Sequence, residues 1–257
     1  MSMRPIVSAD WLAEHIDDAG VVVADVRPAM AYQQAHLPGA ISLDLAAARL
    51  ASSTPAGIEH WLPRVQALVQ RAGITADQTV VFYEDVSGTM SAYGVWLLDA
   101  AGLGNGAMLD GGIQNWHRAG HPLSNELTTL APSETTITPN LAVVGTLDGL
   151  LAEIGQDEGQ RVDARATGEY SAGAMPDAIN VDWNRHLDPA TGSFLPLADL
   201  RTLYADLDPA LPTTTYCAGG FRAANSYVVL KTLGFAQPRN YAPSWGEWGM
   251  QPHTPKV

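Results

Sequence analysis

The sequence predicts an α/β protein made of two similar domains, each a small parallel β-sheet flanked by helices. Short buried apolar runs alternate with longer stretches of helical periodicity, which is the pattern of a parallel sheet covered by helices on its faces. The same order of motifs also occurs twice along the 257 residues. Because a repeated unit of ordinary domain size indicates duplication, two related domains are expected.

The buried strands are predicted from short runs that are rich in β-branched or aromatic residues. Three of them are VVVADV (21–26), TVVFY (79–83) and TTTYC (213–217). A fourth run, AMLDGG (107–112), indicates a strand that leads into a glycine turn. Loops at the carboxyl ends of such strands form the sites of α/β proteins, so we expect the functional residues there.

The helices are predicted from apolar periodicity that ends at a glycine. PRVQALVQRAGI (63–74) has a helical period, with Gly73 as its stop signal. MSAYGVWLLDAAGLG (90–104) and ANSYVVLKTLGF (224–235) each carry an apolar stripe that runs up to a glycine. Alternation of these helices with the strands predicts that helices cover both faces of each sheet.

The duplication is visible residue by residue in segments 21–45 and 160–184. The matched pairs are Asp25 with Asp163, Arg27 with Arg165, Tyr32 with Tyr170, Pro38 with Pro176, and Ile41 with Ile179. Segment 79–104 matches 213–235, and segment 110–116 matches 242–248, in the same order. Between the copies, NELTTLAPSETTITPN (125–140) shows no amphipathic period and predicts an exposed linker. The expected domains are therefore residues 1–124 and 141–257.

Composition excludes several classes of function. The net charge of −13 argues against nucleic acid and anionic membranes as partners, because both require clustered cations. The first residues carry charges and lack an apolar stretch, so a cytoplasmic protein without a membrane span is expected. One cysteine allows no internal disulfide, cysteine-rich zinc site or iron–sulfur cluster. The histidines show no metal-ligand spacing, so neither a metal nor a cofactor is expected.

The single cysteine, Cys217, is the candidate nucleophile. It lies in the loop CAGGFR (217–222), between a predicted strand and a predicted helix. Gly219 and Gly220 allow a tight turn with N–H groups pointing inward, and the helix N-terminus and Arg222 add positive charge. These features favour a thiolate. The alternatives are a buried, inert cysteine and an arginine that is an ordinary surface residue. Because a cation is disfavoured at a helix N-terminus, Arg222 needs a compensating anion, and Cys217 is the expected one.

These motifs together resemble the tandem-domain rhodaneses, the thiosulfate and 3-mercaptopyruvate sulfurtransferases. The marks that carry the resemblance cover nearly the whole chain: DVR (25–27), HLPGA (36–40), DGGIQNW (110–116), DAR (163–165), the cysteine loop and SWGEWG (244–249). The resemblance implies two rhodanese-like domains, of which the second is catalytic. Glu84 stands at the position of the cysteine in the first domain, which is therefore expected to be catalytically silent.

The resemblance also implies a reaction. Cys217 would take a sulfane sulfur from thiosulfate or 3-mercaptopyruvate as a persulfide and pass it to cyanide or a thiol, with ping-pong kinetics. Backbone N–H groups of Ala218, Gly219, Gly220 and Phe221, together with Arg222, would stabilise the anionic sulfur. No cofactor is needed for these two steps.

Two segments of the sequence bear on the identity of the donor. A loop that ends in arginine resembles that of bacterial thiosulfate enzymes, whereas mercaptopyruvate enzymes typically carry a C-G-S-G-V loop. The family's GHIPG segment is replaced in the second half by AGAMPDA (172–178), which has no arginine. Arg185 is the nearest candidate to bind the donor. The alternative for Arg185 is a surface ion pair with Asp182 or Asp188.

Three further residues are expected to support the site. Asp163 is predicted to brace the active loop together with Arg165, or else to make an ordinary strand-end turn. Trp245 and Glu247 border the site or serve as packing anchors. Two other functions stay open at this stage: a cysteine-based phosphatase, whose loop is one residue longer, and a non-catalytic sulfur carrier.

Overall fold

The computed structural model describes residues 4–156 and 159–257 and divides the chain into two compact units. Unit 1 comprises Met1–Ala48, Leu62–Pro139 and Leu187–Phe194, and unit 2 comprises Arg49–Trp61, Asn140–His186 and Leu195–Val257. The sequence predicts one boundary at 125–140. The observed units differ from it in two segments, since residues 49–61 belong to unit 2 and residues 187–194 to unit 1. Within the described ranges, no helix is both long and apolar enough to span a bilayer.

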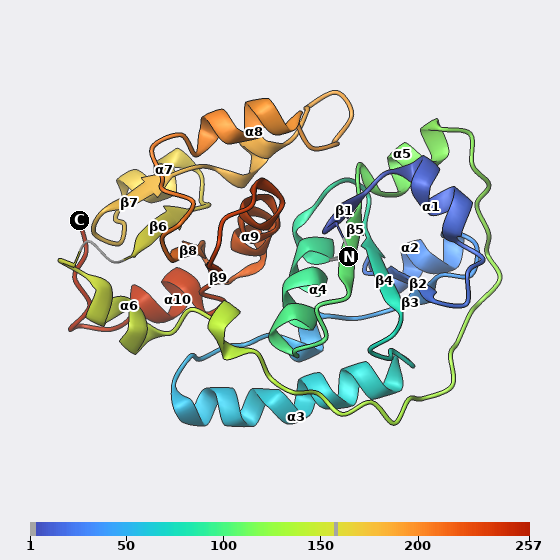
Figure 1. Cartoon of the computed structure of the whole chain (residues 1–257), viewed down its shortest axis with the longest axis horizontal. Coiled ribbons are helices and arrows are strands. Elements are labelled where there is room, and N and C mark those ends of the chain that lie inside the picture. The colour runs from blue at the N-terminus through green and yellow to red at the C-terminus, as the bar shows by residue number, and fades with distance from the viewer. Residues whose placement is uncertain (1–3, 157–158) are drawn as a thin grey trace. The chain divides into compact units, whose positions relative to one another are not determined.

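Unit 1 is built on a five-stranded parallel sheet in the order β1-β5-β4-β2-β3. Its strands are β1 (Ile6–Val7), β2 (Val21–Asp25), β3 (Ile41–Ser42), β4 (Thr79–Tyr83) and β5 (Gly106–Leu109). One side of the sheet is covered by α4 (Thr89–Ala100), and the other by α1 (Ala9–His15), α2 (Ala29–Gln34) and α5 (Gly112–Arg118) (Figure 1). All residues of β2 and β4 after the first are buried, as expected for strands that helices cover on both faces.

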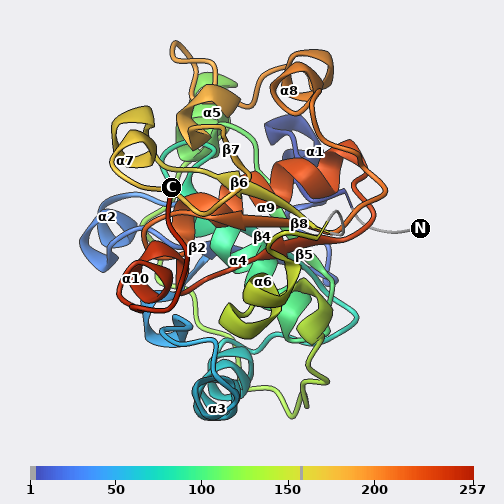
Figure 2. The ribbon, with the colours of Figure 1, turned by 90° about the vertical axis from the view of Figure 1, so that its left-hand side faces the viewer.

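Unit 2 has a four-stranded parallel sheet in the order β7-β6-β8-β9. Its strands are β6 (Gln160–Asp163), β7 (Ala178–Asn180), β8 (Thr213–Tyr216) and β9 (Pro238–Asn240). Its helices are α6 (Leu147–Glu153), α7 (Thr167–Ser171), α8 (Leu197–Leu203), α9 (Phe221–Leu233) and α10 (Ser244–Trp248). Leu150 of α6 and Trp248 of α10 pack with Tyr216 of β8 in one core cluster. Figure 2 shows this unit from the side of α6 and α10.

The remaining helices are α3 (Pro55–Arg71) and three short 3-10 helices, Ala46–Ala48, Leu141–Val143 and Trp183–His186. The helix predicted within residues 63–74 is present but longer than that segment, because α3 begins at Pro55 and Pro63 lies inside it. The buried side chains of Trp61, Val65 and Leu68 follow a helical spacing that already begins before Pro63.

The two units repeat the same hydrogen bonds at matching positions. Arg27 forms an ion pair with buried Asp25, and Arg165 forms one with buried Asp163. Each arginine also donates to a backbone carbonyl eight residues further along the chain, at 2.6 and 2.7 Å. The predicted two-domain parallel α/β architecture is confirmed, and the duplication extends to these strand-end contacts.

Candidate active site

The loop that carries Cys217 connects β8 to α9, as the sequence predicts. Cys217 directly follows β8, and α9 begins at Phe221. Gly220 has a φ of +94°, a left-handed conformation that glycine adopts without steric penalty. A Cβ atom at this position would lie 2.4 Å from the carbonyl oxygen of Ala242. Both the backbone angle and the close approach therefore require glycine here.

The sulfur of Cys217 is buried but lies among polar groups. Its Sγ accepts a hydrogen bond from the backbone N–H of Gly220 at 3.1 Å. Ala164, Ala223 and the half-buried Trp183 pack around the side chain, and Cys217 is 2% exposed. Burial alone fits the alternative of an inert cysteine. The amide contact at the N-terminus of α9 distinguishes this sulfur from that of an apolar core cysteine.

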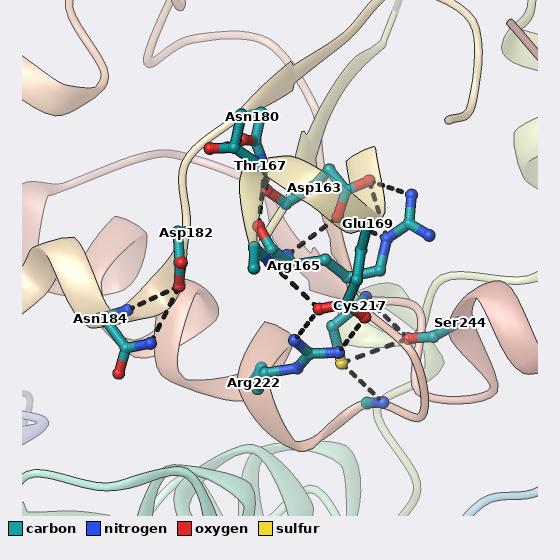
Figure 3. Close-up of polar contacts among 12 residues, drawn as sticks. Asp163, Arg165, Thr167, Glu169, Asn180, Asp182, Asn184, Cys217, Arg222 and Ser244 are labelled. Atoms are coloured by element: carbon teal, nitrogen blue, oxygen red, sulfur yellow. Dashed lines mark hydrogen bonds and ion pairs between the residues drawn. The ribbon is translucent and has the colours of Figure 1, made fainter. Parts of the chain in front are cut away.

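Ser244, the first residue of α10, positions this loop. Its hydroxyl accepts a hydrogen bond from the N–H of Cys217 at 3.0 Å (Figure 3). The same hydroxyl donates to the carbonyl of Tyr241 at 2.7 Å. Ser244 has a φ of +57°, an unfavourable conformation for a residue other than glycine, which costs about 1–3 kcal/mol. Trp245 also donates its N–H to the carbonyl of Cys217 at 3.0 Å. The start of α10 therefore fixes the backbone on both sides of the cysteine.

Arg222 forms a bidentate ion pair with Glu169 beside Cys217 (Figure 3). The two N–O distances are 2.6 and 2.9 Å. The pKa of Arg222 is raised by hydrogen bonding to Glu169 and also by the nearby sulfur of Cys217. Hydrogen bonding to Arg222 in turn lowers the pKa of Glu169. The expectation that Cys217 alone is the compensating anion is therefore corrected, because Glu169 holds the guanidinium with two hydrogen bonds while the sulfur of Cys217 lies beside it.

Asp163 and Arg165 form a buried ion pair at the end of β6, called the brace below, and the N–H of Arg165 also binds Asp163 in a strand-end turn. Support of the active loop by this pair stays a prediction. The Arg165 guanidinium binds both carboxylate oxygens of Asp163 at 2.5 to 3.0 Å, and both residues are buried. It also lies 4.5 Å from the ring centroid of Trp245 and 5.6 Å from that of Tyr216. Burial raises the pKa of Tyr216 and keeps its hydroxyl protonated. The brace thus links β6 to Tyr216 of β8 and Trp245 of α10.

Glu247 of α10 binds residues from the segment 49–61. One carboxylate oxygen accepts from Ser52 Oγ at 2.8 Å and from the N–H of Ser53 at 2.9 Å. The other accepts from Ser53 Oγ at 2.5 Å and from Tyr241 Oη at 2.7 Å. Burial raises the pKa of Tyr241, and hydrogen bonding to Glu247 adds to this rise. Glu247 therefore ties a segment of the first half of the sequence to unit 2.

The other residues of the predicted site lie as follows. In the loop, Ala218 is exposed, while Gly219 and Phe221 are half-buried. Arg185 is exposed on the 3-10 helix Trp183–His186. Neither of its predicted ion pairs occurs within residues 4–156 and 159–257, because Asp182 instead accepts from the backbone N–H and the side-chain amide of Asn184. A donor-binding role for Arg185 stays a prediction.

The corresponding loop of unit 1 contains a built-in anion. Glu84 directly follows β4, and its Oε1 accepts from the N–H groups of Met90 and Ser91 at 2.7 and 3.0 Å. The hydroxyl of Ser91 donates to the same oxygen at 3.1 Å. Burial nevertheless raises the pKa of Glu84. Each unit thus presents helix N–H groups to the side chain that follows its central strand, a carboxylate in unit 1 and a sulfur in unit 2.

Sequence reasoning did not single out Glu169 or Ser244. Ser244 belongs to the quoted SWGEWG motif, but only the aromatic and acidic members of that motif attracted attention. Glu169 had one local signal, since it follows the matched DAR segment and precedes the matched Tyr170. Its pairing with Arg222 joins residues 53 positions apart, and no local pattern reports such a contact.

The chain is similar to known proteins over nearly its whole length. The sequence model of the family described as Rhodanese-like domain matches residues 8–119 and 146–251. A thiosulfate sulfurtransferase of Corynebacterium glutamicum is 33% identical, over 97% of this chain and 89% of its own length. A probable 3-mercaptopyruvate sulfurtransferase of Pseudomonas aeruginosa is 31% identical, over 99% of this chain and 98% of its own. The crystal structure of SseA from Escherichia coli shares the fold, with a TM-score of 0.79 and 24% identity over 95% of this chain and 99% of that one.

Proposed function

The chain belongs to the rhodanese family and is a sulfurtransferase, and we propose that it carries sulfane sulfur as a persulfide on Cys217. The proposed donor is thiosulfate, and the proposed acceptor is cyanide or a thiol. The observation that supports this assignment is the contact of 3.1 Å between Cys217 Sγ and the N–H of Gly220 at the start of α9. A cytoplasmic location stays a prediction of the sequence.

In the first step the Cys217 thiolate attacks the outer sulfur of thiosulfate. A bond forms between the two sulfur atoms while the bond from the outer sulfur to the sulfonate sulfur breaks. Sulfite leaves with that electron pair, and the cysteine becomes a persulfide. The exposed Ala218 and half-buried Gly219 mark the side of the loop from which the donor approaches.

In the second step the acceptor attacks the terminal sulfur of the persulfide. The sulfur–sulfur bond to the cysteine breaks, thiocyanate or a hydrodisulfide leaves, and the thiolate returns. The loop is already held by Ser244 and by the left-handed Gly220, so its N–H groups need little reorganisation to stabilise a negatively charged sulfur. Because the chain has no second cysteine, the acceptor comes from outside the protein.

A second donor, 3-mercaptopyruvate, is supported by the likeness to the Pseudomonas aeruginosa relative. A cysteine loop that ends in an arginine, Arg222, favours thiosulfate, because it resembles the loop of bacterial thiosulfate enzymes. Steady-state kcat/KM values for the two donors with one common acceptor rank them directly, and the value for thiosulfate is expected to be higher.

The test of the persulfide is an intact-mass measurement on the purified chain. Incubation with thiosulfate is expected to add one sulfur atom, and cyanide is expected to remove it. The variant Cys217→Ala should gain no sulfur under the same conditions. A sulfur atom that appears equally in Cys217→Ala, or wild-type protein that never gains one from either donor, would refute the assignment.

A further inference from the structure

Two arginines near Cys217 are already paired with carboxylates. One is Arg222 of the cysteine loop, and the other is Arg165 of the brace. Arg222 is held by both carboxylate oxygens of Glu169, and Arg165 is held by those of Asp163. Arg165 is moreover buried. An anionic donor that meets this loop therefore meets two cations whose charge is already matched by a carboxylate.

A third guanidinium, that of Arg49, lies against the outer side of the loop. A Cβ atom placed on Gly219 would be 2.8 Å from Arg49 Nη2 and 3.5 Å from its Cζ. The φ of Gly219 lies outside the left-handed range, so its backbone angle does not demand glycine. These distances place the Arg49 guanidinium against the backbone of Gly219.

The backbone beside Arg49 is anchored to unit 2, in which both Arg49 and the cysteine loop lie. Ser52 and Ser53 bind the carboxylate of Glu247 through three hydrogen bonds of 2.5 to 2.9 Å. Buried Ser53 also accepts the N–H of Leu147 at 2.9 Å. Arg49 is therefore close in sequence to two serines that hydrogen bonds hold in place.

Arg49 has no carboxylate partner among residues 4–156 and 159–257, and it is exposed. A guanidinium presents a planar set of donors that fits the oxygens of a sulfonate or carboxylate group. A sulfur donor whose outer sulfur points to Cys217 would place its sulfonate or carboxylate group at the rim of the cysteine loop.

We propose that Arg49 is the residue that binds the anionic end of the donor, delivered to the catalytic loop from the first half of the sequence. This inference rests on the proposed sulfur transfer through Cys217. It assigns donor recognition to Arg49 in place of Arg185, whose exposed side chain forms no hydrogen bond or ion pair with the loop among the described residues. In the first step, the same guanidinium would stay paired with the sulfite that leaves.

The test is the KM for thiosulfate in Arg49→Ala, with Arg49→Lys as the conservative variant. Loss of a hydrogen-bonded charge pair is expected to raise KM about 10- to 100-fold in the alanine variant, with kcat much less affected. The lysine variant keeps the charge and should recover part of the affinity. Arg201→Ala is the matched control, because Arg201 is an exposed arginine of α8 in the same unit. Arg185→Ala tests the rival residue.

The outcomes separate this inference from the proposed function. An unchanged KM in Arg49→Ala, an equal rise in Arg201→Ala, or a rise only in Arg185→Ala would overturn the role of Arg49. Intact mass at saturating thiosulfate reports the function independently, since Arg49→Ala should still gain one sulfur atom that cyanide removes. Wild-type protein that gains no sulfur would refute the function itself. Unfolding midpoints of all the variants confirm that they fold.

Discussion

At the scale of single residues, the charge state of the site is set by the pair Arg222 and Glu169. The guanidinium lies beside the sulfur of Cys217, and the carboxylate holds it there with two hydrogen bonds. Glu169 also accepts the N–H of Ala166 at the start of α7, at 3.3 Å. The pair thus fixes the direction of Arg222 and removes most of its net positive charge from the loop.

Replacement of Glu169 by Gln is expected to flatten the acid dependence of stability. Hydrogen bonding to Arg222 holds the pKa of Glu169 below its ordinary value of 4.5. The pair therefore contributes stability above that pH, and this contribution is lost as the pH falls through the lower pKa of the folded state. Because the Glu169 side chain is 42% exposed, the effect should stay below about 1 kcal/mol.

Urea unfolding of wild type and Glu169→Gln at several pH values between neutral and strongly acidic measures this effect. The two free energies of unfolding should converge as the pH falls. Curves that run parallel over the whole range would show that the ion pair contributes nothing in solution.

At the scale of elements, α10 organises the catalytic loop from outside. Its first residue, Ser244, binds the N–H of Cys217, and Glu247 one turn later binds the segment 49–61. A helix of five residues has little stability of its own, so its position depends on these tertiary contacts. The same short helix therefore links the shape of the loop to the location of Arg49.

Glu247→Gln is expected to lower the free energy of unfolding by about 1–3 kcal/mol. The carboxylate accepts four hydrogen bonds. In the variant, an NH₂ group replaces one of the two acceptor oxygens. Where it faces the donors of Ser53 and Tyr241, it cannot accept their hydrogen bonds. Ser52→Ala removes a single one of these bonds and serves as the matched control with a smaller loss. Urea denaturation compares the three proteins. A loss in Glu247→Gln no larger than that in Ser52→Ala would contradict the role assigned to the carboxylate.

At the scale of the whole molecule, both units have a loop after the central strand in which N–H groups bind a side chain, but that side chain differs. Unit 1 carries Glu84 where unit 2 carries Cys217, and both follow the matched tyrosines Tyr83 and Tyr216. A carboxylate cannot accept a sulfur atom and return it, whereas a thiolate can. We therefore expect unit 2 alone to carry out the sulfur transfer.

Glu84→Gln tests this division. Burial raises the pKa of Glu84 in the folded state, so wild type loses stability as the pH rises through that pKa, and the variant does not. The difference in unfolding free energy should therefore move in favour of the variant between mildly acidic and neutral pH. Sulfur transfer from thiosulfate should be unchanged. A large loss of kcat in this folded variant would contradict the assignment of unit 1 as catalytically silent.

Much of the fold was predictable, because parallel strands leave continuous apolar runs and duplication shows every run twice. The position of Cys217 between a strand and a helix followed from the same pattern. Glu169 and Arg49 were not predictable, since each reaches the loop from a distant part of the sequence. Local periodicity reports which residues share an element and a face, but it does not report which unit a connecting segment such as residues 49–61 joins.

The most direct test of the central claim is a single-turnover measurement with thiosulfate and no acceptor. Wild-type protein is expected to release one sulfite for each chain and then stop, because the lone cysteine is occupied as a persulfide. Cys217→Ser should release none. Sulfite release by Cys217→Ser, or release by wild type that continues beyond one equivalent without an acceptor, would contradict persulfide transfer through Cys217.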